Sequence, residues 1–287
     1  MSTLESQIVD RVRTMPALPA PITRLFVMLG DPRSSAADAE AVIRPDAALT
    51  ANILRLVNSA FFGLSRSVTS VRQAVALLGL RRVLESATSV SMLKFVPSTL
   101  PGYGIDARAY WDHCAATAVI SEELIAELRL PTQELAFTAG LLHDVGKLAI
   151  ASYLLGDAKW KTARFDAYAP SFLEAEELAL GTTHAAVGAM LALRWQLPET
   201  LVWVTRWHHQ PESAGDAAPA VLLDVVHLAD ALAHSLGYGA DQGELSRTAS
   251  AQAAARLGVR VRRLESVAAA SVAKIKAMSE VFVNRVG

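Results

Sequence analysis

The chain has 287 residues, of which 52% are hydrophobic and 19% charged, and its formal net charge is −1. Because neither sign of charge is in excess, no strong electrostatic field is expected, and nucleic acid is not an expected partner. The single cysteine excludes a disulfide bond within the chain, as is usual for a cytoplasmic protein. The first residues lack the apolar stretch of a signal peptide, and no uncharged run of about 18 apolar residues predicts a membrane span.

Apolar residues recur at helical spacing along almost the whole sequence, whereas alternating strand patterns are scarce, so we predict an all-α fold. In the first hundred residues, helix-capping and helix-breaking residues separate several short segments. Ser35, Asp46 and Ser70 mark the starts of three helices, and Gly79 separates two others. The helices predicted in this part span residues 4–13, 22–29, 35–43, 47–57, 70–78 and, after Gly79, up to about residue 95.

Residues 97–104 contain two prolines and two glycines, which is typical of a boundary between two parts of a chain. We therefore expect an N-terminal helical lobe over residues 1–100 and a second helical lobe over residues 105–287. Longer helices are predicted in the second lobe, at residues 107–128, 132–155, 172–180, 183–195, 198–208, 219–236 and 264–283.

The pair His143-Asp144 lies inside a strongly apolar helical segment. A carboxylate without a partner in such surroundings is costly, and a metal ion is the simplest compensation for its charge. Adjacent residues of a helix point about 100° apart, so both side chains can reach one site from a single turn. Lys147 shares that face of the helix, where its ammonium group suits a phosphate oxygen.

Further imidazoles and one more carboxylate stand on other predicted helices. His208-His209 is a second adjacent pair, at a helix end from which both rings can turn towards one ion. Nitrogen and oxygen ligands of this kind favour divalent first-row metals over calcium or magnesium. The remaining candidate ligands are His113, His184 and Asp230, each on its own predicted helix.

A histidine taken singly is more often an ordinary core or surface residue than a metal ligand. We interpret His227 and His234 in that way, with the alternative that His227 orients Asp230 from one helical turn away. Cys114 is interpreted as a small buried hydrophobic residue. The two adjacent pairs, and the order of the whole set, are harder to explain without a metal.

In this order the candidate ligands resemble those of the HD metal-dependent phosphohydrolases. They are most similar to those of the HD-GYP phosphodiesterases, which act on cyclic di-GMP. The first half resembles the HDOD module, the HD-related output domain of bacterial signalling proteins, in residues 15–19, 44–49, 58–63 and 74–79. The resemblance covers nearly the whole chain and implies an HD-type helical bundle with an N-terminal helical lobe.

The HD-GYP pattern implies two divalent ions, of iron, manganese, zinc or nickel, that share Asp144. Ala109 replaces a glutamate that supports a third ion in some relatives, so two ions are expected rather than three. The Gly-Tyr-Pro signature is absent after His209, which is a departure from that family. The implied ligands are His113, His143, Asp144 and Asp230 for one ion, and Asp144, His184, His208 and His209 for the other.

These features support two functions. The first hypothesis is a regulatory signalling module, as the HDOD resemblance implies, with a signalling protein or a small phosphate-containing ligand as its partner. The alternative is a metal-dependent phosphohydrolase or phosphodiesterase acting on a nucleotide or cyclic dinucleotide, in which Asp144 and Lys147 take part in catalysis. A purely structural metal site is a third hypothesis.

Overall fold

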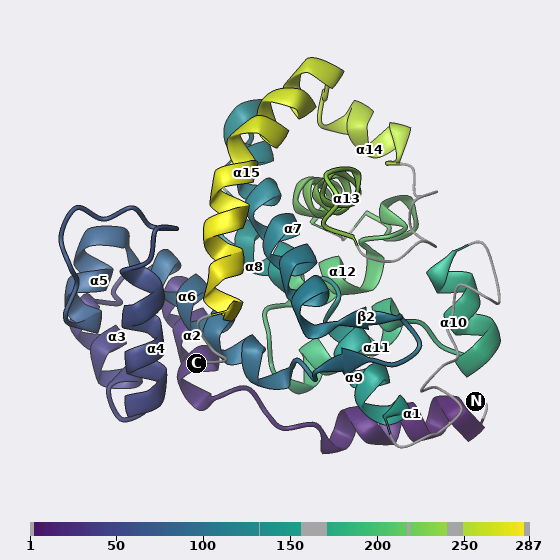
Figure 1. Ribbon diagram of the computed structural model, residues 1–287, viewed down its shortest axis with the longest axis horizontal. Coiled ribbons are helices and arrows are strands. Elements are labelled where there is room, and N and C mark those ends of the chain that lie inside the picture. Colours follow the sequence, from purple (N-terminus) through teal and green to yellow (C-terminus); the bar gives the residue numbers. More distant parts are fainter. Residues whose placement is uncertain (1–2, 132, 156–170, 217–218, 240–248, 284–287) are drawn as a thin grey trace.

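A computed structural model describes residues 3–131, 133–155, 171–216, 219–239 and 249–283 of the chain. Its regular structure is almost entirely helical, so the all-α prediction is confirmed (Figure 1). One small antiparallel sheet was not predicted, and it pairs β1 (Thr99–Leu100) with β2 (Ile105–Asp106). No helix in the described part of the chain is long and apolar enough to cross a membrane.

The helices of the first part are α1 (Thr3–Thr14), α2 (Ala20–Leu29), α3 (Ala36–Ile43), α4 (Ala47–Val57), α5 (Val71–Leu78), α6 (Leu80–Met92) and the short 3₁₀ helix η1 (Leu93–Phe95). Those of the second part are α7 (Ala107–Leu128), α8 (Ala136–Leu142), α9 (Val145–Leu154), α10 (Phe172–Leu180), α11 (His184–Arg194), α12 (Glu199–Trp207), η4 (Pro211–Ser213), α13 (Ala220–Ser235), α14 (Ala251–Arg256) and α15 (Val261–Val283).

The predicted caps of the first part are formed. The side chains of Ser35, Asp46 and Ser70 each accept the backbone N–H three residues later, at the starts of α3, α4 and α5. Such caps satisfy N–H groups that have no partner within the helix, and they explain why these boundaries are readable from the sequence. Gly79, at φ +85°, separates α5 from α6 as expected.

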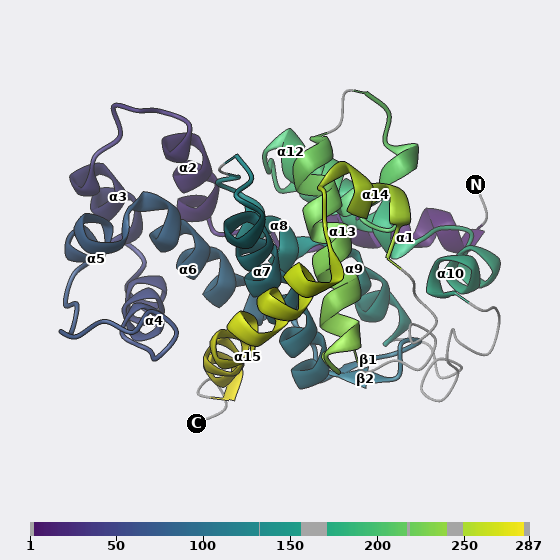
Figure 2. The same ribbon diagram turned by 90° about the horizontal axis from the view of Figure 1, so that it is seen from above.

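Two groups of helices are visible, joined by α6 and α15 (Figures 1 and 2). In one group, α6 packs against α2, α4 and α5, and α3 packs against α5. In the other, the long helix α7 packs against α8, α13 and α15, while α11 packs against α9 and α12. The helix α7 therefore runs through the middle of the second group and packs against α8 and α13, which lead to or carry candidate ligands.

The helix α1 lies away from the rest of the first group and packs against α9 and α11 (Figure 1). Arg11 Nε donates a hydrogen bond to Ser152 Oγ at 3.0 Å. Beyond α1, Trp195 Nε1 donates to the carbonyl of Pro16 at 3.0 Å. The first residues thus brace the two helices that flank the candidate site.

Residues 132–155, predicted as one helix, contain two. Residue 132 lies outside the described part, α8 ends at Leu142, and α9 begins at Val145. Asp144 has φ −96° and ψ 12°, and its carbonyl accepts the N–H of Lys147 in the first turn of α9. The prediction that the side chains of His143 and Asp144 project from one continuous helix is therefore wrong. These two residues form the junction between α8 and α9.

A cluster of four charged side chains joins α6 to α7. Arg81 and Arg82 each contact both Glu85 and Glu122, at nitrogen–oxygen distances of 2.5–2.8 Å. Glu85 is only 2% exposed. Burial and the neighbouring Glu122 raise the pKa of Glu85 from its ordinary value of 4.5 to about 7, against the opposing effect of Arg82 and Arg81.

We expect this cluster to make the stability of the metal-free protein depend on pH. Because the folded state raises the pKa of Glu85, its protonated form stabilises the fold below about pH 4.5, and this contribution is lost as the pH rises through 7. The loss is about 1–3 kcal/mol. Urea unfolding between pH 5 and 8 measures it, and Glu85→Gln is expected to flatten the pH profile. If the unfolding free energies of the parent protein and Glu85→Gln changed equally with pH, the pH dependence would not come from Glu85.

Candidate metal centre

The structure brings all seven predicted ligand residues together in the interior of the second group of helices. They come from α7, the α8–α9 junction, α11, the C-terminal end of α12, and α13. Their donor atoms form overlapping groups in which all members lie within 4.8 Å of one another. His143, His184 and His208 have no exposed surface. The groups are Asp144 with His184, His208 and His209; His113 with His143 and Asp144; and His143 with His208 and Asp230.

The carboxylate of Asp144 stands between two sets of imidazole nitrogens. Its Oδ2 atom lies 3.4 Å from His143 Nε2 and 3.6 Å from His113 Nε2. Its Oδ1 atom lies 3.2 Å from His184 Nε2 and 3.6 Å from His208 Nε2. Neighbouring ligands of an ion with bonds of about 2.1 Å lie roughly 3.0–3.4 Å apart. The spacing therefore suits one ion on each side of the carboxylate.

Asp230 and His209 complete the two sets. Asp230 Oδ1 lies 3.2 Å from His113 Nε2 and 3.8 Å from His143 Nε2. Its other oxygen, Oδ2, is 4.0 Å from His209 Nδ1. His209 Nε2 lies 2.6 Å from His184 Nε2. Asp230 consequently faces the same side as His113, and His209 faces the same side as His184.

The Nδ1 atoms of four histidines are held by groups that can only accept hydrogen bonds. For His184 that group is the carboxylate of Glu176, at 2.8 Å. An Nδ1 atom in such a contact carries the proton, so in the neutral ring Nε2 presents a lone pair. For His113, His143 and His208 the acceptors are the carbonyls of Tyr238, Gly140 and Thr205, at 3.0, 2.7 and 3.0 Å.

The Nε2 atoms of these rings converge. His113 Nε2 is 3.2 Å from His143 Nε2, although both Nδ1 atoms are already donors. Within the described residues, His208 Nε2 and Asp144 Oδ1 are buried without any hydrogen-bond partner. Buried polar atoms are almost always satisfied, so this convergence of acceptors calls for cations at its centre. The donor set therefore fits divalent first-row metal ions.

The charges of the site are strongly perturbed. Burial opposes protonation of His184, but Glu176 and Asp144 raise its pKa to about 9. Burial lowers the pKa of His113 and of His208 to about 4. For Asp144, burial opposes ionisation, but Lys147 and His143 hold its pKa well below the usual range. Asp144 is therefore ionised, and His113 and His208 are neutral, the state in which imidazole binds a metal, whereas an ion would displace a proton from His184.

The ammonium group of Lys147 lies against the carboxylate of Asp144. Its buried Nζ atom lies 2.8 Å from Asp144 Oδ2 and 5.6 Å from the centre of the Tyr103 ring. The ammonium group thus balances the charge of Asp144, in addition to any contact that it makes with a phosphate oxygen.

Glu176, on α10, was missed in the sequence. It is fully buried, and Oε2 accepts both the backbone N–H of His184, at 2.7 Å, and its Nδ1–H, at 2.8 Å. The hydroxyl of Tyr103 donates to Oε1 at 2.5 Å. A carboxylate behind a ligating histidine fixes its ring and raises its basicity. Glu174 and Glu177 flank Glu176, and no sequence signal separates the three.

We expect Glu176→Gln to weaken metal binding at the His184 side by about 10–100-fold. The amide presents N–H groups where the carboxylate accepts three hydrogen bonds, so one contact becomes donor against donor. Competition with a chromophoric chelator measures the affinity. The matched control is Glu177→Gln, an exposed neighbour that is expected to bind like the parent protein. Equal affinities of both variants would remove this role from Glu176.

His227 and His234, both interpreted as ordinary residues, have different surroundings. His227 Nδ1 donates to the carbonyl of His208 at 2.7 Å, and Nε2 accepts the N–H of Ser250 at 2.9 Å. It therefore supports the His208-His209 turn through its backbone rather than orienting Asp230. His234 instead lies in the cluster, with Nε2 3.4 Å from Asp230 Oδ1. Cys114 is buried, as predicted.

The sequence and fold have known relatives. An uncharacterized protein of Treponema pallidum (strain Nichols) is 27% identical over 231 residues, which are 76% of this chain. The match spans only 42% of the length of that curated relative.

Solved structures share the fold. An HDOD domain protein of unknown function from Geobacter sulfurreducens superposes with a TM-score of 0.68 at 24% identity, over 99% of this chain and 92% of the other. A protein of Shewanella amazonensis SB2B, provisionally named a phosphohydrolase, gives 0.69 at 24% identity, over 98% of both chains. One of Marinobacter aquaeolei VT8, provisionally named a signal transduction protein, gives 0.74 at 22% identity, over 99% and 62%.

The model of the HDOD domain family matches residues 15–211. This range contains the N-terminal helices α2–α6 and the α8–α9 junction, and it ends just after the His208-His209 pair. The match covers well over half of the sequence, and we conclude that this chain belongs to the HDOD family.

Proposed function

We propose that this chain is a signal-transduction module with a dinuclear metal centre that holds its second group of helices in one arrangement. The observation that carries the proposal is the convergence of four imidazole Nε2 atoms on Asp144. The Nδ1 atoms of the same rings are held by backbone carbonyls and Glu176. Two ions there would bridge five separate segments of the chain. Because ions that bind only the folded state stabilise it, their loading would set how tightly these segments are held.

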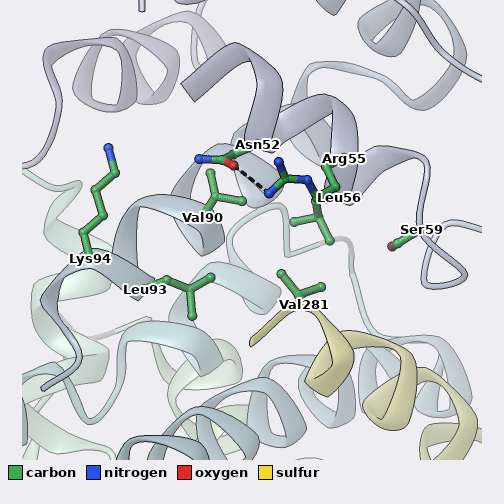
Figure 3. A pocket seen from close by; sticks show the side chains of 8 residues that line it. All are labelled: Asn52, Arg55, Leu56, Ser59, Val90, Leu93, Lys94 and Val281. Atoms are coloured by element: carbon green, nitrogen blue, oxygen red, sulfur yellow. Dashed lines mark hydrogen bonds between the residues drawn. The ribbon is translucent and has the colours of Figure 1, made fainter. Parts of the chain in front are cut away.

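A cavity of about 280 Å³ supports a regulatory role for a small ligand (Figure 3). Asn52 and Arg55 of α4 line one side, and Val281 of α15 lines the other, so an occupant would contact both groups of helices. Arg55 Nη1 contacts Asn52 Oδ1 at 3.1 Å. No acidic residue is among those that line the cavity in the described part of the chain. Its two cations, Arg55 and Lys94, suit the small phosphate-containing ligand that we propose as partner.

Hydrolysis is the second candidate, and a cavity beside the metal centre favours it. This cavity, of about 530 Å³, reaches His209 and is also lined by Thr182, Thr183, Arg206 and Trp207. Divalent ions would polarise a phosphoryl group there and neutralise its charge. Among the chain's own residues, Asp144 would hold both ions in place, and Lys147 would neutralise Asp144 and bind a phosphate oxygen.

The charge of that cavity places hydrolysis second. Glu5, Glu174 and Glu177 line it, and Arg206 is the one positive side chain among its described lining residues. The Arg206 guanidinium already lies over the Trp207 ring, 4.9 Å from its centre. A nucleotide or cyclic dinucleotide carries phosphate charges that these three carboxylates repel, so the lining suits a polyanionic substrate poorly.

Purified protein loaded with Mn²⁺ or Fe²⁺ tests both candidates against cyclic dinucleotides, nucleotides and a generic phosphodiester. The signalling role predicts no turnover above that of Asp144→Asn. It also predicts that a phosphate-containing ligand at 100 times its Kd stabilises the parent protein by about 2.7 kcal/mol, and that Arg55→Ala loses this effect. Turnover that Asp144→Asn abolishes would replace the signalling role by hydrolysis. Failure of the parent protein to bind any metal would remove both.

A further inference from the structure

His234 lies beside two of the metal-ligand residues. It is one turn after Asp230 on α13, is 9% exposed, and its ring centre is 4.6 Å from that of His113. Donor atoms of His113, Asp230 and His234 all lie within 4.8 Å of one another. We propose that His234 is an eighth metal ligand, which binds through Nε2 the ion held by His113 and Asp230; this rests on the proposed metal centre.

The backbone orients the imidazole of His234. A Cβ atom on Gly239 would lie 1.7 Å from His234 Nδ1, so the glycine backbone passes against that edge of the ring. The opposite nitrogen, Nε2, is the one that lies 3.4 Å from Asp230 Oδ1. The backbone carbonyl of the neighbouring residue, Tyr238, accepts the Nδ1–H of His113 at 3.0 Å. One segment after α13 thus turns both rings so that their Nε2 atoms face Asp230.

The set has the composition of a metal site. Two imidazoles and one carboxylate form a common ligand triad for divalent iron and related first-row ions. Asp230 Oδ1 lies 3.2 Å from His113 Nε2 and 3.4 Å from His234 Nε2, separations expected for neighbouring ligands of one ion. The triad shares no member with the group of Asp144, His184, His208 and His209.

The role of His234 is therefore confined to one of the two ions. We expect His234→Gln, which keeps much of the volume but offers a weak ligand, to lower the affinity for that ion at least tenfold and leave the other unchanged. His234→Glu supplies a carboxylate and is expected to recover most of the affinity. Ser235→Ala is the matched control on α13, because that hydroxyl donates to the Ala231 carbonyl of its own helix.

Titration of the four proteins with Zn²⁺ or Mn²⁺, together with elemental analysis after gel filtration, gives the affinities and the number of ions. Histidine ¹⁵N spectra of Zn²⁺-loaded protein give a direct readout, since a bound Nε2 shifts strongly. A His234 signal that moves on loading, together with a selective loss in His234→Gln, is the expected result. Parent-like binding of His234→Gln would overturn this inference alone. A parent protein that binds no ion would overturn the proposed centre and this inference with it.

Discussion

Asp144→Asn is expected to remove both metal ions. The two oxygens of Asp144 face opposite donor sets, with Oδ1 towards His184 and His208 and Oδ2 towards His113 and His143. Asparagine keeps the shape but loses the charge and turns one oxygen into an N–H donor. We expect the affinity for each ion to fall at least about 100-fold, beyond the range for residues that only support a ligand. Elemental analysis after dialysis measures the loss.

The same substitution removes the carboxylate of Asp144 from the ammonium group of Lys147. Lys147 is 2% exposed, and breaking a buried ion pair by removing one partner costs about 3–5 kcal/mol. The double variant Asp144→Asn with Lys147→Met removes both charges, and is expected to recover much of the stability in urea unfolding but no metal binding. The double variant thus separates the effect of losing a metal ligand from the effect of losing stability.

Asp112→Asn controls for a change of charge beside the site. Asp112 precedes the proposed ligand His113 on α7, but its carboxylate pairs with Arg108 at 2.6 Å and is partly exposed. Parent-like metal content is expected for this variant, with a change in stability below about 1 kcal/mol. If Asp144→Asn retained both ions, the bridging role of its carboxylate would be excluded.

The sequence predicts most helices because their signals are local. Asp46 and Ser70 cap helices through atoms three residues away, and such caps look the same in the chain as in the fold. By contrast, the break before Val145 depends on side chains from other helices that meet at Asp144. The helix α14 and the small sheet are short, and their apolar pattern is too brief to read.

The candidate site likewise contains residues that the sequence indicates and residues that only the fold reveals. The adjacent pairs His143-Asp144 and His208-His209 stand out, the first because a charge within an apolar segment requires an explanation. Glu176 and His234 act through contacts with residues that only the fold brings near. Glu176 looks like either of its acidic neighbours, and His234 looks like an ordinary helix residue until α7 and α13 pack together.

Gly146→Ala is expected to disrupt the site, because an added methyl group would collide with the backbone of α11. A Cβ atom at Gly146 would lie 1.9 Å from the carbonyl oxygen of His184 and 2.6 Å from the N atom of Gly188. Both contacts are with backbone, so no side-chain rotation relieves them, and α9 and α11 must separate. Because this close approach carries His184 to Asp144, we expect a loss of about 3 kcal/mol or more of unfolding free energy.

The substitution Gly30→Ala gives the comparison. At Gly30 the nearest atom to an added Cβ is the Val27 carbonyl oxygen, 3.6 Å away, and φ is −82°, which alanine adopts without strain. Its urea midpoint is expected to stay near that of the parent protein, while that of Gly146→Ala falls and His184-dependent metal binding weakens with it. If both glycine variants were equally stable, the helices α9 and α11 would not be in the contact that positions His184. The glycine of the His-Asp-Val-Gly-Lys sequence is then explained as a packing requirement of the proposed metal centre, since only a residue without a side chain lets the backbones of α9 and α11 meet here.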